Sequence, residues 1–270
     1  MTTSKLLAVW DLNPLVLAGC LAALLTYGAY SRPWAWQRAS YFAGALLATV
    51  LALMSPIAVL AKGVLFSAHM LQHLLLVLVV PPLVLLALPR PAAASTHKDA
   101  GQRAALRPWH GWLLGVGAMW LWHAPTLCNA ATSNGAVRAL QTLSLLGMGS
   151  AFWWPILAPK QEARVAPLGG VLYLFAACTA CTALGVLVTF SPIAVCSAYT
   201  HPSDSLGLLS LVRDQWGITC ANDQRIGGLL MWVPACLIYG SAILGSLARW
   251  YRSDQANALT AGASDSQAVT

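Results

Sequence analysis

The chain has 270 residues, of which 58% are hydrophobic and 9% are charged. About a quarter of the residues in a soluble domain are charged, so this composition excludes a soluble protein and indicates a polytopic membrane protein. The formal net charge of +7 requires no nucleic-acid partner, because lysine and arginine gather in the cytoplasmic loops of membrane proteins.

Seven apolar segments are long enough to cross a bilayer, and each must form a helix because unpaired backbone groups in hydrocarbon are too costly. In chain order they are residues 12–30, 40–61, 68–88, 110–127, 136–157, 167–189 and 225–248. We therefore predict an all-α integral membrane protein in which residues 1–252 form a bundle of seven transmembrane helices. Residues 253–270 lack apolar periodicity and are predicted to form a disordered cytoplasmic tail.

The basic residues predict the orientation of this bundle. One side of the predicted spans carries Arg32, Arg38, Arg90, Lys98, Arg103, Arg107, Lys160, Arg164, Arg249 and Arg252, and the other carries Lys5, Lys62, Arg138, Arg213 and Arg225. The richer side faces the cytoplasm, so the N-terminus is expected outside and the C-terminus inside. The connection 90–108, rich in alanine and basic residues, is predicted to be a mobile cytoplasmic loop.

Two further patterns predict local structure. Gly111 and Gly115 form a GxxxG spacing in the fourth predicted span, which is typical of closely packed helices. The stretch "SLGLLSLVRDQWG" (205–217) lies in the longest outer connection and predicts a short interfacial helix.

Polar residues open the third predicted span, "SAHMLQHLLLVLVVPPLVLLALP" (67–89). At 100° per residue, Gln72, His69, His73 and Met70 follow one another around a single face of the helix. The predicted orientation puts this face at the outer end of the span. A single histidine at a helix end is more often a hydrogen-bonding residue than a ligand, but several ionisable residues at one depth favour a functional site.

Two other spans bring polar residues to the same depth. "WLWHAP" places His123 near the outer end of the fourth span. "NDQRIGGLLMW" opens the seventh span with Asp223 and Gln224, and Met231 follows two turns deeper. A mixture of imidazole and thioether suits copper, whereas calcium and magnesium require oxygen ligands.

We therefore predict that His69, Met70, His73 and His123 hold copper as Cu(I), since histidines at i and i+4 have the spacing of helical metal sites. Asp223 is expected either as a further ligand or, preferably, as a group that fixes the tautomer of a ligand histidine. Further residues that can support the site or bind the metal are Gln72, Gln224 and Met231.

The chain contains seven cysteines. Cys20, Cys178, Cys181 and Cys236 lie inside predicted spans, where packing of small residues is favoured over metal binding even for the CxxC spacing of Cys178 and Cys181. The remaining three, Cys128, Cys196 and Cys220, are expected on the outer, oxidising side. Cys196 and Cys220 flank the same outer connection, and we predict a disulfide between them.

Four segments resemble, in the same order, signature segments of the CtaG family of cytochrome c oxidase assembly factors. They are the third-span segment above, "WLWHAP", "FWWPIL" and "DQRIGGLLMWVPACLIYG", and the resemblance extends from about residue 10 to about residue 250. It implies a non-enzymatic chaperone of the bacterial inner membrane that helps a haem-copper oxidase to mature through its copper. The implied partners are the oxidase subunits and a periplasmic copper chaperone.

The resemblance carries over to His69, Met70, Gln72, His73, His123, Asp223 and Gln224, but the chain departs from the family pattern at two places. Many family members have Glu-His where this chain has Gln141-Thr142, and they tend to have tyrosine where Cys128 and Cys196 stand. The cysteines Cys128, Cys196 and Cys220 are therefore weaker candidates for the site.

Two other functions remain open. In a haem-bearing membrane oxidoreductase, His73 and His123 would be the axial ligands of the haem. In a copper transporter the ion would have to cross the bundle, and the segment below His73 offers few polar residues. A retinal protein is excluded because residues 225–248 contain no lysine to form a Schiff base.

Overall fold

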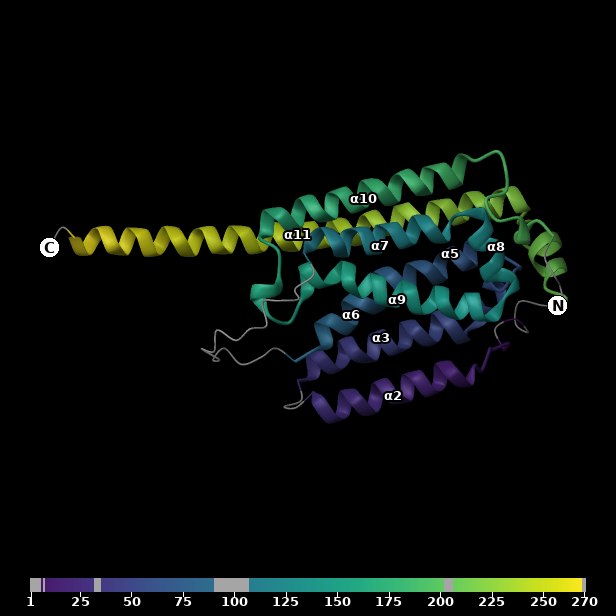
Figure 1. Ribbon diagram of the computed structural model, residues 1–270, viewed down its shortest axis with the longest axis horizontal. Helices are drawn as coiled ribbons and strands as arrows, with labels where there is room; N and C mark the ends of the chain where they lie inside the picture. The colour runs from purple at the N-terminus through teal and green to yellow at the C-terminus, as the bar shows by residue number, and fades with distance from the viewer. Residues whose placement is uncertain (1–5, 7, 32–34, 90–106, 202–205, 269–270) are drawn as a thin grey trace.

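The computed structural model describes residue 6 and residues 8–31, 35–89, 107–201 and 206–268, and within these residues every regular element is a helix (Figure 1). In chain order the elements are α2 (Pro14–Tyr30), α3 (Trp36–Met54), α4 (Pro56–Ala61), α5 (Phe66–Leu74), the π-helical segment η1 (Leu75–Val79), α6 (Val80–Ala87), α7 (Pro108–Trp122), α8 (Pro125–Ser133), α9 (Gly135–Leu157), η3 (Gln161–Ala163), α10 (Pro167–Phe190), η4 (Ser197–Tyr199), the π-helical segment η5 (Ser210–Gln215) and α11 (Cys220–Ala268).

The chain is a membrane protein by the length and composition of its helices. Four described helical stretches are long and apolar enough to cross a bilayer: Trp36–Met54, Phe66–Ala87, Pro167–Phe190 and Cys220–Gln255. The shorter helix Pro14–Tyr30 is also apolar. Leu172, Phe190 and Leu237 are each at least 70% exposed on the outside of the bundle, as lipid-facing side chains are. Each of the seven predicted spans contains helix, but only some of the spans contain a described helix that meets this length criterion.

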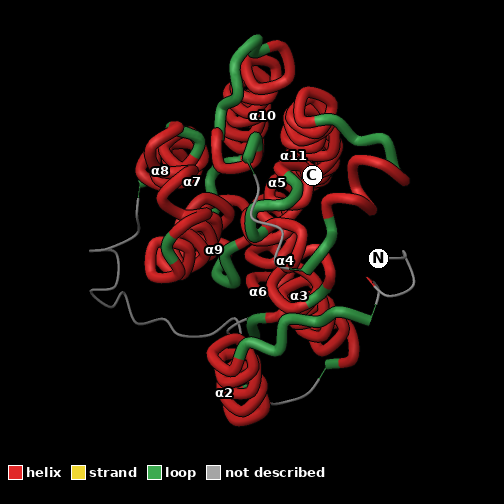
Figure 2. Tube along the Cα trace, turned by 90° about the vertical axis from the view of Figure 1, so that its right-hand side faces the viewer, coloured by secondary structure: helices red, strands yellow, loops and turns green. Residues whose placement is uncertain are grey.

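The long helices run side by side along the longest axis of the molecule (Figures 1 and 2). The most extensive packing is between α10 and α11, followed by α7 with α9 and α3 with α6. The edge of the bundle is formed by α2, none of whose residues is buried. It stacks Tyr27 on Phe42 of α3 with ring centroids 4.0 Å apart. The core therefore lies between α3 and the helices that follow it.

Prolines explain where the third predicted span departs from an ideal helix. Pro81 and Pro82 have no N–H, so the carbonyl of Val77 loses the backbone donor that an α-helix would supply. The indole Nε1 of Trp153 on α9 donates to this oxygen at 3.1 Å. A neighbouring helix thus supplies the hydrogen bond that this carbonyl in η1 lacks, because a backbone group in the membrane needs a partner within the protein.

Glycines allow α7 and α9 to approach each other closely, as the GxxxG spacing predicts. A Cβ atom on Gly111 would lie 2.5 Å from the carbonyl oxygen of Ala151. A Cβ atom on Gly115 would lie 2.6 Å from the Cβ of Phe152. Any side chain at either position would push the two helices apart.

The connection between α10 and α11, predicted to lie outside, packs onto the protein. Its helical part is the π-helical segment η5, and its residues Leu208, Leu211 and Val212 are buried in a small apolar cluster with Leu60 and Leu65. The predicted interfacial helix is therefore shorter than expected and packs against α4 and the start of α5.

The helix α11 continues to Ala268 and projects beyond the bundle, where the sequence predicted no regular structure (Figure 1). Alanine has the highest helix propensity, and growth from a helix that already exists needs no new nucleus. The predicted loop 90–108 lies outside the described residues up to position 106.

Candidate metal centre

The structure brings the four predicted copper ligands together at one end of the bundle. His69, Met70 and His73 lie on α5, His123 follows the last residue of α7, and all four are at most 5% exposed. The ring centroids of His69 and His73 are 4.3 Å apart, and those of His73 and His123 are 5.5 Å apart. The Nε2 atom of His123 lies 3.1 Å from the Sδ atom of Met70. We call these four residues the histidine–methionine cluster.

The contacts of His123 define its tautomer. Its Nδ1 atom is 2.5 Å from the carbonyl oxygen of Met119, and because a carbonyl only accepts, Nδ1 must carry the hydrogen. Burial disfavours a second proton on the ring, so Nε2 presents a lone pair. The Sδ atom of Met70 also carries only lone pairs. Two acceptors therefore face each other, an arrangement that a bound cation would stabilise.

Other buried polar atoms at the cluster have no hydrogen-bond partner among the described residues. They are Nε2 of His69, both ring nitrogens of His73 and Nε2 of Gln141. Gln141 is buried on α9 near His73. An unsatisfied buried polar group costs about 1–3 kcal/mol. Several such groups in one place indicate a site that binds something.

A small cavity of about 10 Å³ adjoins His73. Its walls are formed by Met70, His73, Leu74, Leu78, Met119, Cys181 and Met231. A volume of this size holds about one water molecule or one ion. Because three thioethers, a thiol and an imidazole surround it, the donor set is soft and suits Cu(I).

Three residues that line the cavity were predicted for the site: Met70, His73 and Met231. Two others, Met119 and Cys181, were not assigned to it. Met119 precedes His123 by one turn on α7, and this i, i+4 spacing was a signal available in the sequence. Cys181 was assigned to packing, because the rotation of α10 that turns it towards His73 cannot be read from spacing.

The histidine nitrogens do not converge on one point. No group of three or more His, Cys, Asp or Glu side chains in the described part of the chain is arranged to hold a metal ion. A metal bound here would therefore use the methionine sulfurs together with imidazole, or would require the rings of His69 and His73 to rotate.

Asp223 contacts the first turn of α5 and not the histidines. One carboxylate oxygen accepts from the backbone N–H of Phe66 at 2.7 Å, and the other accepts from the N–H and the hydroxyl of Ser67 at 2.9 and 2.6 Å. A carboxylate at a helix N-terminus satisfies free N–H groups and interacts favourably with the helix dipole. Asp223 thus fixes α5, which carries three residues of the cluster.

Gln224 and Gln72, which were predicted to support the site, hydrogen-bond to the backbone of neighbouring segments. Gln224 accepts from the N–H of Val195 at 2.9 Å and donates to the carbonyl of Ile193 at 3.1 Å, which ties the connection after α10 to α11. Gln72 donates to the carbonyl of Ala52 on α3 at 2.7 Å. These amide groups hold neighbouring segments in place around the cluster.

The paired glycines of "DQRIGGLLMW" allow α11 to lie against two helices. A Cβ atom on Gly227 would lie 2.5 Å from Cδ1 of Phe66 and 3.1 Å from Cγ of Met70. A Cβ atom on Gly228 would lie 2.7 Å from the backbone nitrogen of Thr189 on α10. Gly227 therefore helps to set the position of Met70.

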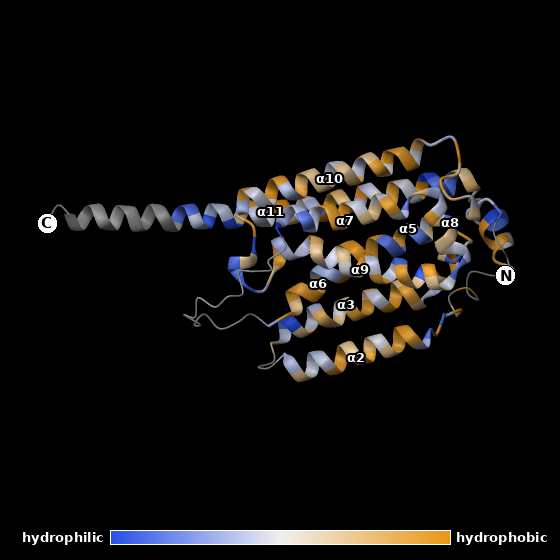
Figure 3. Ribbon diagram, in the orientation of Figure 1, coloured by the Kyte–Doolittle hydropathy of each residue, from blue (hydrophilic) through white to orange (hydrophobic). Residues whose placement is uncertain are grey.

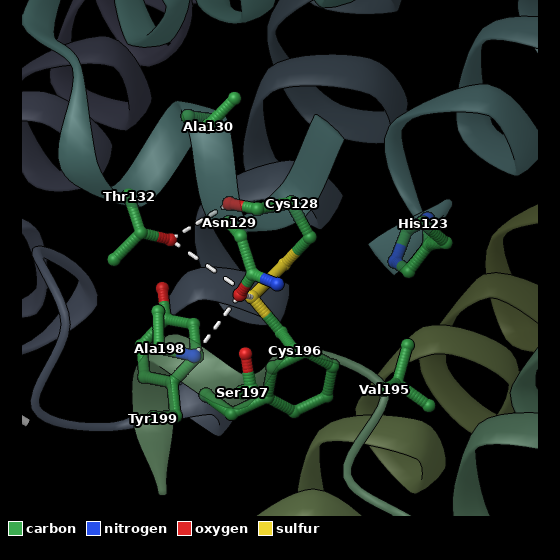
Figure 4. Close-up of a disulfide and its surroundings, with 12 residues drawn as sticks. His123, Cys128, Asn129, Ala130, Thr132, Val195, Cys196, Ser197, Ala198 and Tyr199 are labelled. Atoms are coloured by element: carbon green, nitrogen blue, oxygen red, sulfur yellow. Dashed lines mark hydrogen bonds between the residues drawn. A yellow bond between two sulfur atoms is a disulfide. The ribbon is translucent and has the colours of Figure 1, made fainter. Parts of the chain in front are cut away.

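A disulfide joins Cys128 of α8 to Cys196, with Cα atoms 5.8 Å apart (Figure 4). The predicted disulfide between Cys196 and Cys220 is wrong, because Cys220 is an exposed free cysteine. The chain turns at Pro125 into the short helix α8, which carries Cys128 to the connection after α10. A sequence separation of 68 residues gives no hint of this approach.

The disulfide fixes the segment that covers the outer side of the cluster. Tyr199 lies three residues after Cys196, is buried, and has its ring centroid 5.9 Å from that of His69. Its hydroxyl donates to the carbonyl of Ala61 at 2.7 Å. Burial raises the pKa of this phenol above its usual range. The sequence analysis did not identify Tyr199, and no motif marks it.

Together these features define an all-helical membrane protein with a buried cluster of imidazole and thioether groups beneath one end of the bundle. A family model for the cytochrome c oxidase caa3 assembly factor (Caa3_CtaG) matches residues 19–253, so the chain belongs to this family. It is accordingly an assembly factor for cytochrome c oxidase, as the resemblance implied. Searches of curated proteins and of solved structures found no match.

Proposed function

We propose that this chain binds Cu(I) at the histidine–methionine cluster and helps to metallate the oxidase without catalysing a reaction. The observation that carries the proposal is the 3.1 Å approach of His123 Nε2 to Met70 Sδ, two lone-pair donors with no hydrogen between them. The unsatisfied nitrogens of His69 and His73 and the adjoining cavity of about 10 Å³ support it.

The residues of the cluster suit Cu(I) as a cargo. Imidazole and thioether are soft to intermediate donors, which favour copper over magnesium or calcium. The backbone carbonyl of Met119 holds His123 in the tautomer that a metal ligand needs. Neutral ligands let the ion bind and leave without the strong attraction of a thiolate or carboxylate, which suits transfer to another protein.

The proposal includes a bundle of seven membrane-spanning helices with the cluster near the periplasmic face of a bacterial inner membrane. Polar residues gather at both ends of the bundle and apolar residues between them (Figure 3). Of the basic residues in the described part, six lie towards the end opposite the cluster and four towards the cluster end. The six are Arg38, Arg107, Lys160, Arg164, Arg249 and Arg252, and the four are Lys62, Arg138, Arg213 and Arg225. By the positive-inside rule the end opposite the cluster is cytoplasmic. The partners are then oxidase subunits and a periplasmic copper chaperone.

The haem alternative fits this geometry less well. The rings of His73 and His123 are 5.5 Å apart and almost perpendicular, and the cavity beside His73 is about 10 Å³. Axial ligation needs two histidines on opposite faces of a large macrocycle. Copper transport would need an ion path through the bundle, and copper flux into proteoliposomes containing the purified chain would favour it.

The test is the copper content of the purified chain after loading with Cu(I) under reducing conditions. We expect His73→Ala and His123→Ala to lose one copper ion per chain while remaining folded and inserted. His201→Ala is the matched control, because His201 is exposed and bonds to Thr200. Cells with either cluster variant should contain normal amounts of oxidase subunits but copper-deficient oxidase, partly rescued by added copper. Equal copper in all four proteins would contradict the proposal.

A further inference from the structure

Three cysteines on α10 and α11 form a second group of sulfur atoms, separate from the histidine–methionine cluster. The Sγ atoms of Cys178 and Cys236 are 2.9 Å apart. This distance exceeds a disulfide bond, which is about 2.05 Å. Cys181 lies one turn after Cys178 on α10. Sequence spacing alone favoured packing for these residues, because Cys236 is 58 positions from Cys178.

Two hydroxyl groups lie beside these cysteines. The hydroxyl oxygen of Thr182 is 3.3 Å from the sulfur of Cys236, and the hydroxyl of Tyr239 is 3.7 Å from the sulfur of Cys181. Tyr239 is buried, whereas Cys178 and Cys236 are half-buried where α10 packs on α11. In both contacts either atom can donate the hydrogen. Cysteine sulfur is a soft ligand that binds a soft metal when the metal displaces its proton.

Cys181, which lies beside the pair, also lies beside the histidine–methionine cluster. Cys181 lines the small cavity beside His73, together with Met70, Met119 and Met231. Cys236 follows Met231 by five residues, or about 7.5 Å along a helix axis. Sulfur atoms of methionine and cysteine thus extend from the cluster into the middle of the bundle.

We propose that Cys178 and Cys236 form a second Cu(I) site, with Cys181 beside it. Thiolate ligands select Cu(I), and the two sulfurs, which lie 2.9 Å apart, would separate to take the ion between them. Binding of Cu⁺ with the release of one thiol proton to solvent leaves a site without net charge, as the apolar interior requires. No oxidant or reductant is needed. A two-ligand site is also compatible with the absence of a larger metal-binding group from the described residues.

This inference deepens the proposed function but rests on its own contacts, so the two can fail separately. The experiment measures copper per chain and Cu(I) affinity by competition with bathocuproine disulfonate, using the full-length protein in nanodiscs under reductant. Four proteins are compared with wild type: Cys178→Ser/Cys236→Ser, His73→Ala, the combination of all three changes, and Cys20→Ser. The last is the control, because Cys20 lies on α2 at the edge of the bundle.

We expect two copper ions in wild type and Cys20→Ser, one in the thiol double variant, one in His73→Ala, and none in the combination. X-ray absorption of loaded His73→Ala should show sulfur neighbours without imidazole nitrogen. Two coppers in the thiol double variant would overturn the second site and leave the cluster intact. Two coppers in His73→Ala and one in the thiol variant would overturn the cluster instead. A Cys178–Cys236 disulfide in protein taken from unstressed cells would also overturn the thiol site.

Unfolding temperatures and size-exclusion profiles show whether each variant is folded. Serine is close to cysteine in size, and Thr182 can hydrogen-bond to it, so the double variant should fold. Should it not, Cys236→Ala alone provides the same comparison, because a single thiol no longer forms the pair.

Discussion

Asp223 shows how one residue outside the cluster controls the position of three residues within it. It is 1% exposed, and its carboxylate accepts three hydrogen bonds from Phe66 and Ser67 at the start of α5. The first turn of α5 leads directly into His69 and Met70. A change at Asp223 should therefore affect both the stability of the fold and the affinity for copper.

For Asp223→Asn we expect a lower unfolding temperature in detergent and weaker Cu(I) binding. The amide retains one acceptor oxygen but turns an NH₂ group towards an N–H donor, which leaves that donor unsatisfied at about 1–3 kcal/mol. The control is Asp11→Asn, since Asp11 forms an ion pair with Lys62 in which both side chains are partly exposed. Such pairs contribute about 0–1 kcal/mol. Equal effects of the two substitutions would contradict the role of Asp223.

Much of the candidate site could be predicted residue by residue because helical geometry is regular. The wheel places His69, Met70 and His73 on one face, and hydropathy gives the depth of His123 and Met231. Contacts that depend on the rotation of two helices about their own axes could not be predicted. These include Cys181 at the cavity, the Cys128–Cys196 disulfide and Tyr199 over His69.

At the scale of helices, each span predicted from hydropathy contains helix, but hydropathy did not predict the breaks within the spans. The span 40–61 is divided at Ser55, because a residue before proline avoids the helical conformation and Pro56 starts a new helix. The span 110–127 is divided in the same way before Pro125. Mean hydropathy over a window does not change when one residue lacks an N–H group. Predicting such breaks therefore also requires the preference of a residue before proline for an extended conformation.

Gly227 provides a prediction about the packing of α11 on α5. We expect Gly227→Ala to lower the free energy of unfolding by about 1–3 kcal/mol, the usual cost of overpacking. The added methyl group would meet Phe66 and Met70, so copper affinity should fall as well. Thermal unfolding and copper competition of the purified variant measure the two effects.

The matched control on the same helix is Gly240→Ala. A Cβ atom on Gly240 has no atom within 4 Å, and alanine stabilises a helix by up to about 1 kcal/mol relative to glycine. This variant should be as stable as wild type or more stable, with unchanged copper binding. Should both alanine variants behave alike, helix propensity and not the contact with α5 would explain the result.

For the whole molecule, the side of the membrane on which the cluster lies decides which proteins it can serve. The ends of the bundle differ in charge: Arg249 and Arg252 lie near one end of the candidate span Cys220–Gln255, whereas Arg225 near its other end stands beside Asp223. Positive residues remain on the cytoplasmic side. The cluster, the disulfide and Cys220 should therefore lie together at the outer face, where disulfides persist.

Cys220 is a natural probe of this orientation, because it is an exposed free thiol at the start of α11. A membrane-impermeant maleimide should label Cys220 in intact cells or spheroplasts. In a Cys220→Ser background, Asp254→Cys should be labelled only after the membrane is permeabilised, since Asp254 lies near the other end of the candidate span Cys220–Gln255. Cys220→Ser alone is the control for labelling of the cysteines within the bundle. Labelling of both positions in intact cells would mean that α11 does not cross the membrane, and the proposed outer position of the cluster would lose its basis.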